Sequence, residues 1–337
     1  MLKVLKKFYL VGLVVVMMFA LFTSVQPSNA QDAVRIGTSS VGSVFYTIAI
    51  GASEIITKHA GINATAEPLG GSAANVYGLG AKKIEFALAN AFASFSGYHG
   101  TYTFKKPVDI KLVVQGQPSF RFLVVRKRAE IKTPQDLIGK TVIAKRRSLP
   151  ELELLMNAYI KAFNLPKDKI KVVATTNTNE VIKVLRAGSV DAAILPFSRK
   201  APHLGKPMQD KVIEFLYIPE EKRDEMLKYL PKAMYAGYFE PGTYFGQDKP
   251  VYLFGMNTYF LTRSGVSEDT VYKVAKAIMD NTKEFSTYHK AAAQWTSKRA
   301  LKNVALPFHS GSIRYFKEKG LWTPELEANQ KQLSSQR

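Results

Sequence analysis

Short apolar runs alternate with segments of helical periodicity along this sequence, and this alternation constrains its fold more than any other feature. Val34–Gly37 and Ile84–Ala89 have the length and composition of buried strands. Between them, apolar residues from Val44 to Ile56 recur at helical spacing, and Gly61 follows where that helix is expected to end. Strands that alternate with helices predict an α/β protein with a mostly parallel sheet and helices on both of its faces.

The middle of the chain repeats this pattern. Thr141–Ala144 is an expected strand, and the segment from Ser148 to Glu151 has the capping-box spacing that opens a helix through Phe163. A further helix is expected at Thr178–Ala187, and a long helix from Ser267 to about Tyr288. The alternation therefore extends over most of the chain.

Two extended segments, Arg121–Arg126 and Val251–Thr262, are expected to cross between two α/β lobes, because no linker-like stretch separates the lobes in the sequence. The first lobe would combine residues 31–122 with residues 250–337, and the second would comprise residues 123–249. Ligands of open α/β sheets bind outside the carboxyl ends of the strands, and domain interfaces are preferred positions for pockets. We therefore expect a ligand cleft between the two lobes.

Residues 1–30 have the three-part layout of a secretory signal peptide. Three lysines precede an uncharged, largely apolar run at Phe8–Phe22, and Ser28-Asn29-Ala30 supplies small residues, so cleavage is expected after Ala30. An uncleaved anchor is the alternative, but a spanning helix needs roughly 20 apolar residues and this run is shorter. The chain has no cysteine, which excludes disulfides and a lipidated N-terminal cysteine. The expected location is the periplasm of a two-membrane bacterium.

The sequence is strongly basic, with 47 Lys and Arg against 27 Asp and Glu and a net charge of +20 at pH 7. Such a balance can indicate binding to nucleic acid or to a membrane surface. The basic residues are scattered, however, and no basic stripe alternates with aromatic residues; the densest group is Arg126-Lys127-Arg128. We expect a solvated basic surface that favours acidic ligands, and no nucleic-acid partner.

The sequence has no recognisable catalytic motif. Its five histidines are far apart and share no metal-ligand spacing; they are His59, His99, His203, His289 and His309. There is no His-Glu-x-x-His, no set of paired metal carboxylates and no Gly-x-Ser-x-Gly. A nucleophile needs a base within reach, and the sequence nominates no such pair. It therefore predicts a binding protein with no catalytic residues, no metal and no cofactor.

Two loops rich in serine and glycine stand between an expected strand and an expected helix. Their candidate ligand-binding residues are Ser39, Ser40, Val41, Gly42, Ser43, Gly71, Ser72 and Asn75. Backbone N–H groups at the start of a helix, together with the positive end of the helix dipole, form a site for a carboxylate or phosphate. Small residues before a helix can also be no more than a tight turn and a cap, and this alternative stays open.

A third strand-to-helix junction carries cationic side chains. Arg146, Arg147 and Ser148 follow the expected strand Thr141–Ala144 and stand at the start of the next helix. Arginine recognises carboxylates through two parallel hydrogen bonds, so an arginine here would close over an anion held by the first lobe. Arg121, on an expected crossing, is a further candidate. The alternative is a solvated run of charge.

Over about residues 34–325 the chain resembles the TAXI-family solute-binding receptors of TRAP transporters. The segments that carry the resemblance are Ile36-Gly37-Thr38 with Gly42-Ser43-Val44-Phe45-Tyr46, then Gly70-Gly71-Ser72-Ala73-Ala74-Asn75, Thr133-Pro134-Gln135-Asp136-Leu137-Ile138-Gly139-Lys140, Gly188-Ser189-Val190-Asp191-Ala192-Ala193, and Pro307 to Trp322. The resemblance implies a type II periplasmic-binding-protein fold without enzymatic activity. It also implies capture of a small organic anion, such as a dicarboxylate, a 2-oxo acid or an acidic amino acid, and delivery to TRAP membrane permease subunits.

The resemblance adds Tyr46 and Asn90 to the candidate ligand-binding residues. Asn90 stands where a Ser-Asp pair often follows the third strand, and the segment from Lys145 to Ser148 stands where family members usually have Gly-Ser-Gly-Thr. We expect a monomer whose added arginines favour an anionic ligand. Two alternatives remain: an exported ligand sensor that docks on a membrane kinase, and an enzyme on the same two-lobed scaffold.

Overall fold

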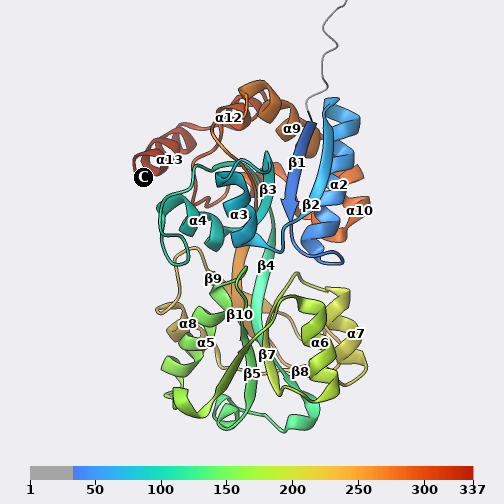
Figure 1. The fold of residues 1–337 in the computed structure, drawn as a ribbon, viewed down its shortest axis with the longest axis vertical. Coiled ribbons are helices and arrows are strands. Elements are labelled where there is room, and N and C mark those ends of the chain that lie inside the picture. The colour runs from blue at the N-terminus through green and yellow to red at the C-terminus, as the bar shows by residue number, and fades with distance from the viewer. Residues whose placement is uncertain (1–32, 337) are drawn as a thin grey trace, which may run out of the picture. The chain divides into compact units, whose positions relative to one another are not determined.

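A computed structural model of the 337-residue chain describes residues 33–336, apart from the side chains of Pro202 and His203. The predicted signal peptide, residues 1–30, and its cleavage after Ala30 lie outside the described residues. Within them, ten strands form one mixed sheet in the order β2-β1-β3-β10-β4-β7-β5-β6, with β8 paired to β4 and β9 to β10 (Figure 1). The predicted α/β class is confirmed.

The strands are β1 (Ala33–Thr38), β2 (Asn63–Pro68), β3 (Phe86–Asn90), β4 (Lys111–Arg126), β5 (Thr141–Lys145), β6 (Lys171–Ala174), β7 (Ala192–Phe197), β8 (Ile213–Phe215), β9 (Tyr235–Phe239) and β10 (Val251–Thr262). The α-helices are α2 (Val44–Ala60), α3 (Ser72–Gly80), α4 (Ala91–His99), α5 (Glu151–Ala162), α6 (Thr178–Ala187), α7 (Pro202–Gln209), α8 (Glu220–Leu227), α9 (Glu268–Asp280), α10 (Thr282–Tyr288), α11 (Ser297–Ala300), α12 (Ser310–Glu318) and α13 (Pro324–Ser335). Short 3₁₀ helices lie at Lys127–Ala129, Pro134–Leu137, Lys167–Lys169 and Lys290–Gln294.

Helix α2 shows how local sequence sets these elements. The Ser43 hydroxyl accepts a hydrogen bond from the Tyr46 N–H at 3.1 Å and caps the first turn. Gly61 ends the helix in the left-handed conformation, with φ of 67°. The apolar face predicted from its periodicity, including Ile48 and Ile55, is buried against the sheet. Figure 1 shows α2 and α10 on one side of the upper strands and α3 and α4 on the other.

The two longest strands, β4 and β10, form an antiparallel ribbon through the middle of the sheet. One end of β10 pairs with β3 and the other with β9, while the later part of β4 pairs with β7 and β8. The predicted crossings, Arg121–Arg126 and Val251–Thr262, are parts of this ribbon. The division into lobes at residues 31–122 plus 250–337 and 123–249 stays a prediction.

A bulge in β4 reverses the face to which its side chains point. Gln115 pairs with Tyr259 and Pro118 with Asn257, so β4 advances three residues where β10 advances two. Directly paired side chains share a face, and successive side chains along a strand alternate. One face of the ribbon therefore carries Gln115, Asn257 and Tyr259, and the other carries Ser119 and Arg121.

Several details differ from the sequence-based expectations. The sheet is mixed because the ribbon runs antiparallel to its neighbours. The crossing expected at Arg121–Arg126 is only the last part of a longer strand, which starts at Lys111. The expected long helix from Ser267 to Tyr288 is interrupted at Asn281, whose φ of −116° leaves the helical range. Helix α4 was not expected, although Asn90 caps it through a hydrogen bond from the Ala93 N–H.

Gly116, inside the bulge, allows a tryptophan to approach the ribbon. A Cβ on Gly116 would lie 2.2 Å from Trp295 Cε2, which is far inside contact distance. Trp295 is fully buried, packs edge-on against Phe260 and Phe285, and donates a hydrogen bond from Nε1 to Gln117 Oε1. The indole therefore has no room to move away.

We predict that Gly116→Ala lowers the free energy of unfolding by about 1–3 kcal/mol, because the new methyl group overpacks the site. Gly265→Ala is the matched control, since a Cβ there meets no atom within 4 Å; its effect should stay within about 0.5 kcal/mol. Chemical denaturation of both variants measures the difference. Equal stabilities would show that Trp295 can be displaced without cost.

Candidate functional site

A pocket lies where strand-to-helix junctions from distant parts of the chain meet. It encloses about 730 Å³ of empty space, its open mouth included. We call it the arginine pocket. Its lining residues are Ser39, Ser40, Val41, Gly42, Ser43, Val44, Phe45, Gly71, Ser72, Ser119, Arg121, Arg146, Leu149, Asn177, Thr178, Asn179, Pro196, Phe197 and Ser198. Two are arginines and none is acidic.

Three helices begin at this pocket. The first residues of α2, α3 and α6 all belong to its lining. Gly71 stands before α3 with φ of 142°, a conformation that favours glycine, and a Cβ there would lie 2.9 Å from Ser148 Oγ. The N-terminus of a helix carries a partial positive charge and N–H groups without partners in the helix. The pocket therefore combines three positive helix ends with two guanidinium groups.

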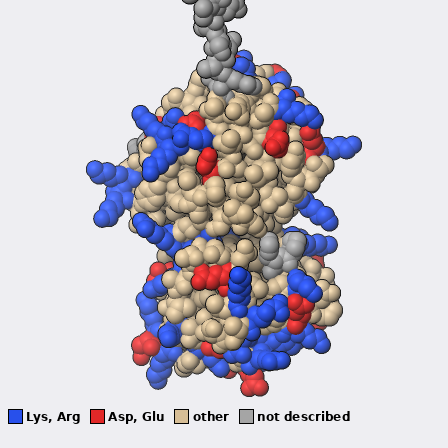
Figure 2. Space-filling view, turned by 45° about the vertical axis from the view of Figure 1, so that its right-hand side comes forward, with Lys and Arg blue, Asp and Glu red and all other residues tan. Residues whose placement is uncertain are grey.

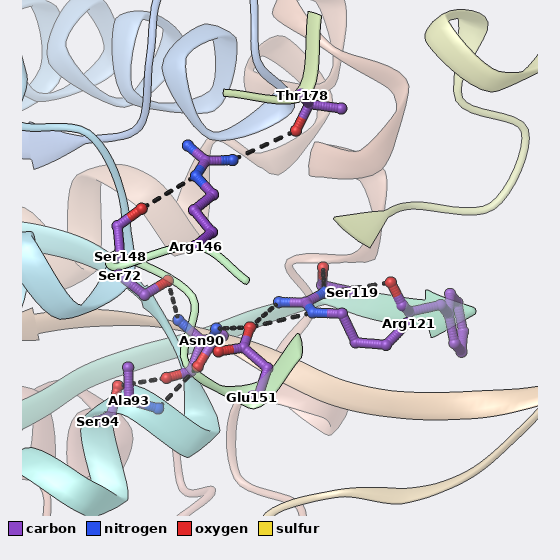
Figure 3. Close-up of polar contacts among 11 residues, drawn as sticks. Ser72, Asn90, Ala93, Ser94, Ser119, Arg121, Arg146, Ser148, Glu151 and Thr178 are labelled. Atoms are coloured by element: carbon purple, nitrogen blue, oxygen red, sulfur yellow. Dashed lines mark hydrogen bonds and ion pairs between the residues drawn. The ribbon is translucent and has the colours of Figure 1, made fainter. Parts of the chain in front are cut away.

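Arg146 is a buried cation in this lining, with 7% of its surface exposed. Its hydrogen bonds go to neutral oxygens only. Nη2 donates to the Gly70 carbonyl at 3.0 Å. Nε donates to Ser148 Oγ at 3.1 Å and Nη1 to Thr178 Oγ1 at 3.4 Å (Figure 3). No carboxylate of residues 33–336 forms an ion pair with it.

Neutral hydrogen-bond acceptors fix the position of the Arg146 guanidinium but do not neutralise its charge. Burial lowers the pKa of its guanidinium from the ordinary value, while the charge of Glu151 opposes this effect. Arginine nevertheless stays protonated at neutral pH. A buried charge without a counter-ion is costly, so this guanidinium is well suited to receive the negative group of a ligand.

Arg121 has a different environment. Only 1% of its surface is exposed, and its Nε and Nη2 donate to Glu151 Oε1 at 3.1 and 2.7 Å. Its Nη1 donates to Ser119 Oγ at 2.7 Å. The same Glu151 oxygen accepts a hydrogen bond from Asn90 Nδ2 at 2.8 Å (Figure 3). Arg121 is therefore neutralised from within the protein.

This network corrects the capping box predicted at Ser148 to Glu151. The residue before the first turn of α5 is Pro150, which makes no side-chain cap. The Ser148 hydroxyl accepts from Arg146 instead, and the Glu151 carboxylate accepts from Arg121 and Asn90. The partner of Ser148 is a charged donor two residues earlier in the same loop, whereas the tertiary fold brings Arg121 and Asn90 to Glu151. Hydrogen bonds from a guanidinium are stronger than those from a neutral backbone N–H.

The structure brings most of the predicted site residues together. Those that line the arginine pocket are Ser39, Ser40, Val41, Gly42, Ser43, Gly71, Ser72, Arg121 and Arg146. Those outside its lining are Tyr46, Asn75, Asn90, Arg147 and Ser148.

The residues outside the lining have other contacts. Asn75 Nδ2 donates to the Leu88 carbonyl at 2.6 Å and ties α3 to β3. Asn90 caps α4 and binds Glu151, and Ser148 orients Arg146. Arg147 is exposed and Tyr46 is half-buried. Asn90 and Ser148 therefore position the lining, whereas Arg147 lies outside it.

Sequence reasoning missed several lining residues. Asn177, Thr178 and Asn179 begin α6 after β6, and Pro196–Ser198 ends β7 and follows it. The rule that nominated the first three junctions, the carboxyl end of a strand before a helix, applies to these two as well. Ser119 carried no such signal, because the bulge that turns it toward the pocket is not visible in the sequence.

The described residues offer little other chemistry. No group of three or more His, Asp or Glu side chains between residues 33 and 336 could hold a metal ion. In the same part of the chain, no helix combines the length and apolar character needed to cross a bilayer.

Two solved structures have a similar fold. MatC from Rhodopseudomonas palustris with bound malate has a TM-score of 0.52 at 12% identity, over 90% of this chain and 98% of that one. The alkanesulfonate-binding protein SsuA from Xanthomonas axonopodis pv. citri bound to MOPS has a TM-score of 0.46 at 13% identity, over 89% and 94%. The mixed α/β fold is that of the periplasmic solute-binding proteins.

Residues 36–320 match the NMT1-like family over most of the chain, and the protein belongs to this family. The narrower assignment to TAXI receptors stays a prediction.

We predict that Glu151→Gln lowers the free energy of unfolding by about 3–5 kcal/mol, because it leaves the buried Arg121 without its counter-charge. The matched control is Glu153→Gln in the same helical turn, whose partner Lys145 is 46% exposed. Removal of that exposed pair should cost less than about 1 kcal/mol. Urea denaturation compares the two variants, and equal losses would contradict a special role for the buried pair.

Proposed function

We propose that this protein is a periplasmic receptor that captures a small organic anion in the arginine pocket. The observation that carries the proposal is Arg146, a buried guanidinium at the pocket wall with no carboxylate partner among the described residues. Helix N-termini and neutral serine, threonine and asparagine side chains surround it. An anionic group there would gain charge-assisted hydrogen bonds while relieving an uncompensated charge.

The charge balance of the lining narrows the ligand class. Because Glu151 already neutralises Arg121, the lining has one cation left for a ligand. Phe45, Leu149 and Phe197 supply apolar surface beside it. We therefore favour a ligand with one anionic head and a partly apolar body, such as a 2-oxo acid, over a dicarboxylate or an acidic amino acid.

The lining also favours a receptor over an enzyme. It contains no histidine, lysine, aspartate or glutamate, so its serines have no general base within the lining. Binding at junctions from both predicted lobes would stabilise a closed form of the protein. Delivery to TRAP membrane permease subunits, by an exported and monomeric receptor, completes the proposal and is supported by the sequence resemblance to TAXI receptors.

Ligand screening tests the proposed function. Thermal unfolding is measured with 2-oxo acids, dicarboxylates, sulfonates and amino acids, including malate and MOPS. A true ligand raises the midpoint with its concentration, because it stabilises only the folded state. Calorimetry then gives the affinity, and prolonged incubation followed by chemical analysis should return the ligand unchanged. Conversion of the ligand would favour the enzyme alternative.

We predict that Arg146→Gln weakens binding of the best 2-oxo acid about 10- to 100-fold, the effect of losing a charged hydrogen-bond donor. The adjacent Arg147→Gln removes the same charge from an exposed position outside the lining. It should change the affinity less than about threefold, because exposed charges are screened. Calorimetry measures the affinity of both variants for the ligand. Equal affinities for wild type and Arg146→Gln would refute a contact between Arg146 and the ligand.

A further inference from the structure

We propose that a second pocket, on the opposite face of the β4–β10 ribbon, binds a small anion that carries several negative charges. We call it the lysine pocket. Its lining residues are Ala91, Gln115, Lys232, Ala233, Tyr235, Asn257, Tyr259, Thr296, Lys298, Arg299, Lys302, Asn303 and Ala305. It encloses about 1210 Å³ of empty space, its open mouth included. The site does not depend on what the arginine pocket binds.

The two pockets lie on different faces because of the bulge in β4. Gln115, Asn257 and Tyr259 point into the lysine pocket, whereas Ser119 and Arg121 line the arginine pocket. The ribbon side chains that form the floor of the lysine pocket therefore do not reach the arginine pocket. An anion in the lysine pocket would leave the arginine pocket free.

Four cations converge on the lysine pocket without a counter-charge. Lys298 and Arg299 belong to α11, Lys302 follows it, and Lys232 precedes β9. No acidic residue belongs to the lining, and none of the four forms an ion pair within residues 33–336. By contrast, surface cations such as Lys276 do have carboxylate partners. Convergent like charges create a positive potential that an anion would relieve.

A chain of hydrogen bonds forms the floor and fixes the backbone that carries these cations. The Tyr235 hydroxyl donates to Asn257 Oδ1 at 3.1 Å, and Asn257 Nδ2 donates to Gln115 Oε1 at 3.1 Å. Gln115 Nε2 then donates to the carbonyls of Arg299 and Lys302, at 2.7 and 2.9 Å. The two walls are thus connected through the ribbon, so the site is organised before a ligand arrives.

The arrangement of charge favours a compact polyanion over a polymer. Nucleic-acid surfaces present extended grooves or stripes of basic residues. On the one face that Figure 2 shows, basic side chains are scattered and form no such stripe. In the lysine pocket the cations surround a concave space instead. Charge concentrated on one small molecule, as in linked phosphates, matches this geometry.

Calorimetry with inorganic tripolyphosphate tests the proposal on the purified protein. We expect one-to-one binding that weakens as salt is added, since ions screen exposed charges, and no comparable binding of acetate at equal ionic strength. The double variant Lys298→Gln/Lys302→Gln should bind tripolyphosphate at least about tenfold more weakly, because two charged contacts are lost. Neither side chain forms a hydrogen bond or an ion pair within residues 33–336, so the fold should remain intact, and thermal unfolding checks this.

The matched control is Lys105→Gln/Lys106→Gln, which removes the same charge from two exposed lysines outside both pockets. The affinity of this control variant for tripolyphosphate should differ less than about twofold from that of the wild type. An equal loss in both double variants would mean nonspecific attraction and overturn the proposal. Unchanged binding in Lys298→Gln/Lys302→Gln, or binding lost only in Arg146→Gln, would place the anion elsewhere and overturn it too. Tyr235→Phe adds a second readout, because loss of the floor hydrogen bond should weaken binding without changing charge.

Discussion

The buried ion pair between Arg121 and Glu151 organises the wall of the arginine pocket. Removing two charges from water costs several kcal/mol for each ion, and only close contacts with further hydrogen bonds offset that cost. Here Glu151 Oε1 accepts from Arg121 twice and from Asn90 once. The pair thereby connects the ribbon, the first turn of α5 and the start of α4. Because Glu151 neutralises Arg121, Arg146 is the cation of the pocket lining that remains available to a ligand.

The bulge in β4 has a second consequence for function. An uninterrupted ribbon would place Gln115 on the same face as Ser119 and Arg121, since side chains alternate with a period of two. The extra residue reverses this, and Gly116 within the bulge provides space for Trp295. One ribbon consequently supplies the floor of two pockets that differ in character. The arginine pocket is rich in hydroxyls and helix N-termini. The lysine pocket has cations without an ion pair among residues 33–336, above a floor of amide side chains.

The rule about strand-to-helix junctions accounts for the part of the site that the sequence predicted correctly. Ser39–Ser43, Gly71 and Arg146 each follow a strand, and the sheet brings them to one pocket. The same rule would have nominated Asn177–Asn179. Arg146 and Arg147 could not be distinguished in the sequence, because only the folded loop decides which side chain is buried. The predicted capping box failed because Ser148 accepts from Arg146 in its own loop and Glu151 pairs with the distant Arg121.

The sequence by itself determined the α/β class and many of the individual helices and strands. Periodicity, caps such as Ser43 and end signals such as Gly61 act over a few residues, so they can be recognised in the sequence. Tertiary structure decided the rest. Glu151 meets Arg121 across 30 positions and Asn90 across 61, the bulge chooses the face of each pocket floor, and three helix starts converge on one space. These features depend on contacts between distant segments, and no local pattern records which distant partner a side chain will meet.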